Sequence, residues 1–153
     1  MSDGETTMGL LGRPRVLVVG DIMLDRYTWG HADRVSPEAP VLVMRAESCD
    51  VRLGGAGAVA ALLRGLDAEV LLAGVIGENH EGATVRRLLD EAGIDGRMLV
   101  TDPARPTTLK ERFLAHVEQR QPHQILRVDH EQTQALAPDL ADQLAAAVER
   151  QLL

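Results

Sequence analysis

The chain has 153 residues, 45% hydrophobic and only 2% aromatic, and its 23 acidic and 16 basic residues give a net charge of −7. This is enough for one folded domain with a core of Leu, Val and Ala, whereas the negative charge and scarce aromatic rings argue against a nucleic-acid partner. The lone cysteine, Cys49, excludes an intrachain disulfide and a multi-cysteine metal site, and no apolar run reaches the 18 residues of a membrane span. A cytoplasmic protein is expected.

The first expected strand is the apolar run Arg15 to Gly20, preceded by a disordered leader over residues 1–14 that has acids where a signal peptide has positive charge. Asp21 and Asp25 follow this strand, at the sheet edge where ligands bind in open α/β folds. Asp25 is the stronger candidate for a substrate contact, because it lies past an apolar triplet and is expected to be partly buried, where a carboxylate needs partners. Asp21 is secondary, since a role as a turn or cap residue is favoured for it.

A β-flap is expected next. Two strand-like pieces, YTWGH and PVLVMRA within Tyr27 to Ala46, flank the turn RVSPEAP, so both strands come before the first helix. Trp29 on such a flap would cover a ligand or pack on a partner subunit. Glu47 to Arg52 is polar and is expected to be a connector back to the main sheet.

The segment Leu53 to Ala61, LGGAGAVAA, runs from a glycine pair into the expected first helix. Gly54 and Gly55 lack Cβ atoms and lie before the free N–H groups of a helix start, so a polar small molecule is expected over them. A tight strand-to-helix turn is the plain alternative. The helix is expected to bury an apolar stripe of Val59, Leu62, Leu63 and Leu66.

Strands and helices alternate in the remainder of the chain, which predicts an α/β fold with a mainly parallel sheet and flanking helices. A second strand pair is expected near residues 107–129, around a polar turn at Glu118 to His123. The apolar end of the chain suggests a truncated sequence. The other elements expected are a strand at Glu69 to Gly77, a helix at Glu81 to Ala92 ended by Gly93, a strand near Arg97 to Thr101, and a helix from Pro138 with Leu140, Leu144 and Val148 on one side.

Five blocks in this order together resemble the amino-terminal half of the ribokinase-like (PfkB) carbohydrate kinases, and most closely the heptose 7-phosphate kinase domain of bifunctional enzymes that make ADP-heptose for lipopolysaccharide. The blocks are GDIMLDRY (Gly20 to Tyr27), RVSPEAPV (Arg34 to Val41), LGGAGAVA (from Leu53), PTTLKERF (Pro106 to Phe113) and QILRVDHE (Gln124 to Glu131).

The resemblance implies an enzyme that transfers the γ-phosphoryl group of ATP, with Mg²⁺, to a sugar or sugar phosphate. By similarity, Asp25 would bind sugar hydroxyls, Gly54 and Gly55 would lie against the sugar ring, and the flap would form a small β-lid that also joins two subunits as a homodimer. Lys110, Arg112 and Arg127 are candidates for holding a phosphate already on the sugar, since fixed cations suit a dianion. Solvated strand charges remain the alternative for these three.

The sequence departs from the family pattern in two respects. An asparagine usually follows the glycine pair, and Ala58 or Val59 stands there, so Ala58 is a secondary candidate position. The family's catalytic base, its anion hole and its ATP pocket are absent from these 153 residues, so no catalytic or metal-binding residue is assigned here and the chain is expected to be inactive alone.

Two other interpretations remain open. Gly55, Gly57 and Ala60 fit the dinucleotide fingerprint G-x-G-x-x-A, although CDVRL precedes it instead of an apolar strand and Val75 stands where an acid is needed. The chain could also be a non-catalytic remnant that binds sugar or forms dimers.

Overall fold

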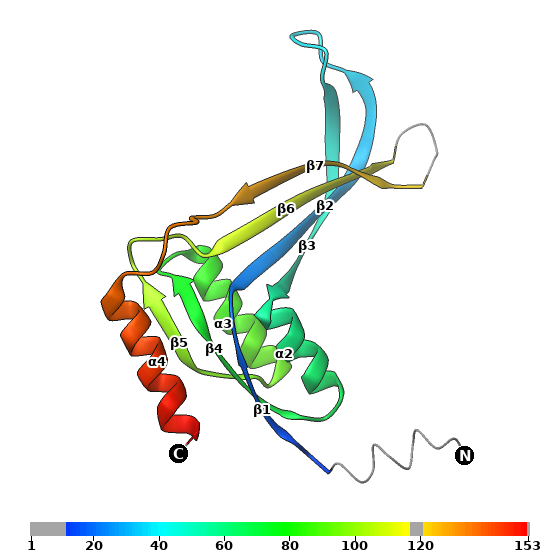
Figure 1. The fold of residues 1–153 in the computed structure, drawn as a ribbon. Helices are drawn as coiled ribbons and strands as arrows, with labels where there is room; N and C mark the ends of the chain where they lie inside the picture. The colour runs from blue at the N-terminus through cyan, green and yellow to red at the C-terminus, as the bar shows by residue number, and fades with distance from the viewer. Residues whose placement is uncertain (1–11, 117–120, 153) are drawn as a thin grey trace, which may run out of the picture.

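The computed structural model describes residues 12–116 and 121–152. Residues 1–11 of the expected leader lie outside these ranges, as do residues 118–120 of the expected polar turn. The described residues form a parallel sheet covered by helices and a second, mixed sheet that projects from it (Figure 1).

The parallel sheet has the strand order β1-β4-β5 and consists of β1 (Arg15–Val19), β4 (Glu69–Gly77) and β5 (Asp95–Asp102). Helices α2 (Ala56–Gly65) and α3 (His80–Ala92) cover one face, and α4 (Pro138–Leu152) lies on the other (Figure 1). The predicted α/β class with a parallel sheet and flanking helices is therefore confirmed.

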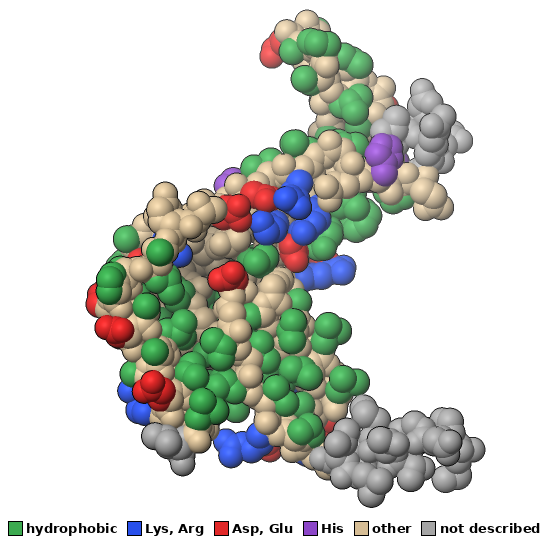
Figure 2. All heavy atoms as spheres, viewed as in Figure 1, with side chains coloured by type: hydrophobic (Ala, Val, Ile, Leu, Met, Phe, Trp, Pro, Cys, Tyr) green, Lys and Arg blue, Asp and Glu red, His purple; other side chains and the backbone are tan. Residues whose placement is uncertain are grey.

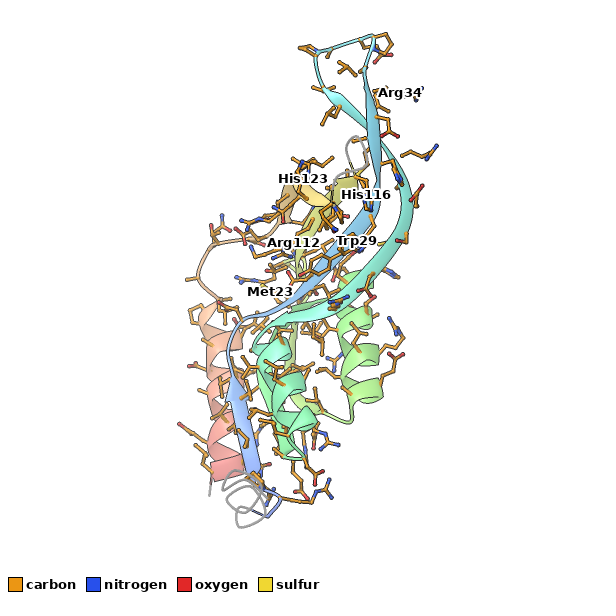
Figure 3. The ribbon with its side chains drawn as sticks, turned by 90° about the vertical axis from the view of Figure 1, so that its right-hand side faces the viewer. Met23, Trp29, Arg34, Arg112, His116 and His123 are labelled. Atoms are coloured by element: carbon orange, nitrogen blue, oxygen red, sulfur yellow. The ribbon has the colours of Figure 1, made fainter. Side chains whose placement is uncertain are left out.

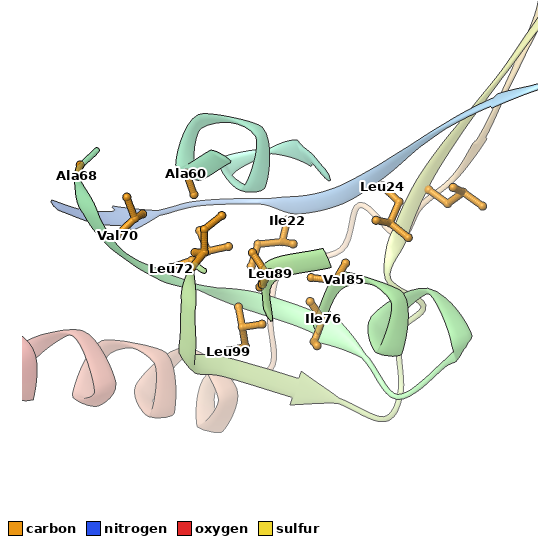
Figure 4. Packing of buried hydrophobic residues seen from close by; sticks show 12 residues of the cluster. Ile22, Leu24, Ala60, Ala68, Val70, Leu72, Ile76, Val85, Leu89 and Leu99 are labelled. Atoms are coloured by element: carbon orange, nitrogen blue, oxygen red, sulfur yellow. The ribbon is translucent and has the colours of Figure 1, made fainter. Parts of the chain in front are cut away.

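The main core fills the space between this sheet and helices α2 and α3 (Figure 4). Leu72, Val85 and Leu89 are among its fully buried side chains. A smaller cluster on the opposite face includes Ala73, against which Leu144 of α4 packs. Because helices cover both faces, β4 is almost continuously apolar along its length, as expected for a buried parallel strand.

Helix α3 matches its prediction, and α2 does not. Gly93 ends α3 in the left-handed conformation, with φ 66°. On α2, however, the buried residues are Gly57 and Ala60, whereas Leu62 is 71% exposed and Leu66 is 60% exposed. The small residues allow α2 to pack closely: a Cβ on Gly57 would lie 3.2 Å from the Cβ of Leu53. The stripe of larger side chains therefore points mostly to solvent, and the predicted buried face was wrong.

The second sheet, called the lid sheet below, has the order β3-β2-β6-β7. Strand β2 pairs antiparallel with β3 and parallel with β6, and β6 pairs antiparallel with β7. Both expected strand pairs are present, but β2 and β3 are longer than predicted, and Glu47 to Arg52 is part of β3 instead of a connector. These residues are mostly solvent-exposed, so no apolar alternation marks them as a strand. The bounds are β2 (Ile22–Val35), β3 (Leu42–Gly55), β6 (Thr108–His116) and β7 (His123–His130).

Candidate functional site

Asp25 and Gly54 lie against each other where the lid sheet leaves the parallel sheet. In the β2–β3 register Met23 is opposite Gly54, and Asp25 is opposite Arg52. A Cβ on Gly54 would be only 2.7 Å from Oδ2 of Asp25, closer than real Cβ contacts come. The structure thus brings together the carboxylate and the glycine that the sequence placed in one site.

Gly55 turns the chain from β3 into α2. It has φ 54° and occupies the N-cap position of α2, where a Cβ would be 2.4 Å from the carbonyl oxygen of Asp21. That carbonyl accepts a hydrogen bond from the backbone N–H of Ala56 at 2.9 Å. Asp21 therefore contributes its main chain to this turn, as its plainer interpretation expected, and its side chain is exposed.

Ala58, the position where the resemblance expects an asparagine, lies in the first turn of α2. It lines an apolar groove together with Leu53 of β3 and Leu62 of α2. No side-chain amide is available at this position to bind a hydroxyl.

The three candidate cations lie on the same face of the lid sheet as Asp25, called the Asp25 face below. Across the β2–β6 register Asp25 pairs with Lys110, and across β6–β7 Arg112 pairs with Arg127. Residues directly opposite each other share a face, and so do residues two apart on one strand. In Figure 3, Arg112 lies near Trp29 in the part of the lid sheet closer to the body, with Met23 at its base.

Each of these cations already has a carboxylate partner. Nη1 of Arg112 donates to Oδ1 of Asp25, and this contact raises the pKa of Arg112. Nζ of Lys110 lies 3.0 Å from Asp129, which it shares with Arg127, and 3.1 Å from Glu131. The carboxylates raise the pKa of Lys110, and the hydrogen bond from Lys110 lowers the pKa of Asp129.

Two aromatic rings on β2 extend this face: Trp29, which the sequence placed over a ligand or on a partner subunit, and Tyr27, which it left without a place in the site. Tyr27 and Trp29 are stacked, with ring centroids 6.5 Å apart. The guanidinium carbons of Arg52 and Arg112 each lie 5.3 Å from the centroid of the Tyr27 ring. The period-two spacing of Asp25, Tyr27 and Trp29 was the signal that could have grouped them.

The opposite face of β2 is attached to the body of the protein, a contact that the sequence did not indicate. Arg26 lies 3.0 Å from Glu111 of β6 and 3.4 Å from Glu81 in the first turn of α3. His130 of β7 lies 2.8 Å from Glu111. Arg26, Glu81 and Glu111 are partly buried, and the contact of Arg26 with Glu81 connects the lid sheet to α3.

A cavity of about 540 Å³ lies at the carboxyl ends of β1 and β4, next to the base of the lid sheet. Asp21, Gly74, Arg105 and Glu131 are among its lining residues. In open α/β sheets this edge is the usual ligand-binding edge. Figure 2 shows charged side chains of both signs where the lid sheet meets the body.

Among residues 12–116 and 121–152, no group of three or more His, Cys, Asp or Glu side chains is arranged to hold a metal ion. Every helix in the same ranges is too short or too polar to cross a membrane.

Comparison with known proteins shows the family. The profile described as pfkB family carbohydrate kinase matches residues 13–152. The chain belongs to the pfkB carbohydrate kinases. Among curated members of this pfkB family, it is 47% identical over 142 residues to D-beta-D-heptose 7-phosphate kinase from Bordetella bronchiseptica, covering 93% of this chain and 43% of that protein. It is 48% identical over 117 residues to the bifunctional protein HldE from Caulobacter vibrioides, covering 76% of this chain and 23% of that protein. This pfkB chain thus spans less than half the length of either relative.

Solved structures show the same fold for this pfkB chain. A carbohydrate kinase from Agrobacterium tumefaciens superposes with a TM-score of 0.60 at 21% identity, covering 76% of this chain and 35% of that one. Arabidopsis thaliana ribokinase, in a structure complexed with ribose and ATP, gives a TM-score of 0.56 at 22% identity, covering 76% and 36%. The predicted ribokinase-like fold is confirmed.

Proposed function

We propose that this pfkB chain supplies the sugar-binding part of a kinase that phosphorylates D-heptose 7-phosphate at O1, a step in making ADP-heptose for lipopolysaccharide. The observation that carries the proposal is the contact between the Asp25 carboxylate and the bare backbone of Gly54. A ligand hydroxyl can approach a side-chain-free backbone closely and donate to the carboxylate. Such a charged hydrogen bond contributes about 1.5–3 kcal/mol, enough to select one orientation of a sugar.

The choice of a phosphorylated sugar is supported by the cations on the Asp25 face. The candidates for holding the 7-phosphate are Lys110, Arg112 and Arg127. They lie on β6 and β7 of the same sheet that carries Asp25 on β2. All three are paired with carboxylates, so a phosphate must take a cation over from Asp25, Asp129 or Glu131. We expect this exchange to make phosphate recognition sensitive to salt, because both partners are charged and partly exposed.

The phosphoryl donor in this proposal is ATP with Mg²⁺, in the cytoplasm. None of the described residues is assigned to either group. Because phosphoryl transfer depends on positioning and on stabilising charge, we expect the chain alone to bind the sugar phosphate without turning it over. We also propose that the lid sheet joins two copies as a homodimer. At the tip of its β2–β3 hairpin, Val35 is 61% exposed and Val41 is 56% exposed.

Calorimetric titration of the chain with D-heptose 7-phosphate tests the proposal. Saturable binding is expected, weakened at least about tenfold by Asp25→Ala through loss of the charged hydrogen bond. Asp33→Ala, on the distal part of β2, serves as the control. No binding by the wild-type chain, or equal binding by Asp25→Ala, would contradict it.

The non-catalytic alternative is a remnant that only binds sugar or only forms dimers. Turnover of D-heptose 7-phosphate by a chain extended over the remaining length of its relatives would exclude it. The dinucleotide alternative does not fit the strand that precedes the fingerprint. The fingerprint requires the preceding strand to belong to a parallel sheet, but β3, which precedes Gly55, pairs antiparallel with β2 in the lid sheet.

A further inference from the structure

The two carboxylate oxygens of Asp25 face different partners. Oδ1 accepts the hydrogen bond from Nη1 of Arg112. Oδ2 is the atom nearest to Gly54, 2.7 Å from where a Cβ would be. An ionised carboxylate has enough lone pairs to serve both sides at once. Oδ2 is therefore the oxygen that a hydroxyl lying over Gly54 would meet, while Oδ1 is engaged by the guanidinium.

Arg112 is held from several sides. Besides the contact with Asp25, its Nη1 lies 3.4 Å from the carbonyl oxygen of Lys110, and its guanidinium carbon lies 5.3 Å from the Tyr27 ring centroid. Only 21% of its side chain is exposed. A guanidinium fixed in this way cannot move to a phosphate without giving up these contacts, whereas Arg127 is 49% exposed.

Resting on the proposed function, we propose that Arg112 is a positioning residue: it holds Asp25 so that Oδ2 faces the sugar hydroxyl over Gly54, and the phosphate is left to Lys110 and Arg127. In this arrangement Arg112 acts on the hydroxyl through Asp25. Its contribution to binding is then the same whether or not the sugar carries a phosphate.

Arg52 provides a matched control on the same face. Its guanidinium carbon lies at the same 5.3 Å from the Tyr27 centroid, and it is opposite Asp25 in the β2–β3 register. Its ion-pair partner, however, is Asp50 at 2.6 Å, and its side chain is 65% exposed. Replacing Arg52 removes a cation near the site without releasing the carboxylate of Asp25.

The test is calorimetric titration of the full 153-residue chain with D-heptose 7-phosphate and with unphosphorylated heptose. For Arg112→Gln we expect affinity to fall about tenfold for both ligands, by equal factors, because the lost interaction concerns the hydroxyl. Lys110→Gln should weaken only the phosphorylated ligand, and Arg52→Gln should change each affinity less than about twofold, as expected for an exposed pair. Thermal unfolding of each variant verifies that it is folded.

Arg112→Lys gives a second measurement should Arg112→Gln not fold. It keeps the positive charge but loses the planar fork, so a smaller loss, again equal for both ligands, is expected. Selective loss of the phosphorylated heptose in either variant would overturn the proposal and make Arg112 a phosphate ligand. Unchanged affinity for both ligands would also overturn it. If the wild-type chain binds neither heptose, the proposed function itself fails, which is a distinguishable result.

Discussion

Gly54→Ala is the most direct perturbation of the candidate site. The new Cβ would be 2.7 Å from Oδ2 of Asp25 and 2.9 Å from Cγ of Met23. An ordinary contact begins near 3.4 Å, so the carboxylate must retreat by roughly 0.7 Å. That shift takes Oδ2 away from a hydroxyl over residue 54. Losing a charged hydrogen bond of about 1.5–3 kcal/mol corresponds to a fall of about 10- to 150-fold in affinity.

The same change should lower stability only moderately. Gly54 does not have a positive φ, so alanine adopts its backbone conformation without strain. The loss of unfolded-state entropy then stabilises the chain by about 0.4–1 kcal/mol, against an overpacking cost of about 1–3 kcal/mol. A net destabilisation of at most about 2.6 kcal/mol is expected from these two terms.

Calorimetric titration with D-heptose 7-phosphate and urea unfolding together test this prediction. Gly65→Ala on α2 is the control, because a Cβ there meets nothing within 4 Å. It should leave binding unchanged and stabilise the helix by about 0.5–1 kcal/mol. If Gly54→Ala binds the sugar phosphate within twofold of the wild-type chain, the glycine does not lie against the ligand and the reasoning is refuted.

Two further predictions concern the ion pairs of the lid sheet. Arg26→Met leaves two partly buried carboxylates without their cation, and the free energy of unfolding should fall by about 1–3 kcal/mol, between the values for exposed and buried pairs. Arg45, whose side chain is 74% exposed, pairs with Glu47, and Arg45→Met should lower the free energy of urea unfolding by less than about 1 kcal/mol. If Arg26→Met and Arg45→Met lower it equally, the contact of Arg26 with α3 does not stabilise the protein. Asp129 has a pKa below its ordinary value of 3.8, owing chiefly to Lys110, so its stabilising contribution is complete above that pH and is lost as the pH falls through the lowered pKa. Asp129→Asn should therefore lose less stability than the wild-type chain between pH 7 and about pH 3, and an identical loss would contradict the assigned cause.

The sequence predicted the parallel sheet well because burial leaves a strong local signal. Strand β4 is covered on both faces and reads as an apolar run, and α3 combines an apolar spacing with a glycine that ends it. Helix α2 carries a similar spacing but packs through Gly57 and Ala60. Periodicity locates apolar side chains without saying how closely a helix can approach its sheet, so the buried face was assigned incorrectly.

The sequence predicted those parts of the candidate site that carry a local motif of their own. The carboxylate after the first strand and the glycine pair before the first helix were each recognisable. The partner of Asp25 was not, because Arg112 is 87 residues away and reaches it only through the parallel register of β2 with β6. The polar residues of β3 likewise become a strand only because β2 supplies their hydrogen bonds.

The lid sheet itself determines the geometry of the proposed sugar site. Asp25, Gly54, Lys110, Arg112 and Arg127 all lie on strands of this one sheet, and backbone pairing sets their relative positions. A change in the angle between the lid sheet and α3 would leave these positions almost unchanged, because they do not depend on contacts with the body. Loosening the contact of Arg26 with Glu81 should therefore reduce stability more than it reduces affinity for the sugar phosphate. Gly54→Ala should have the opposite balance of effects.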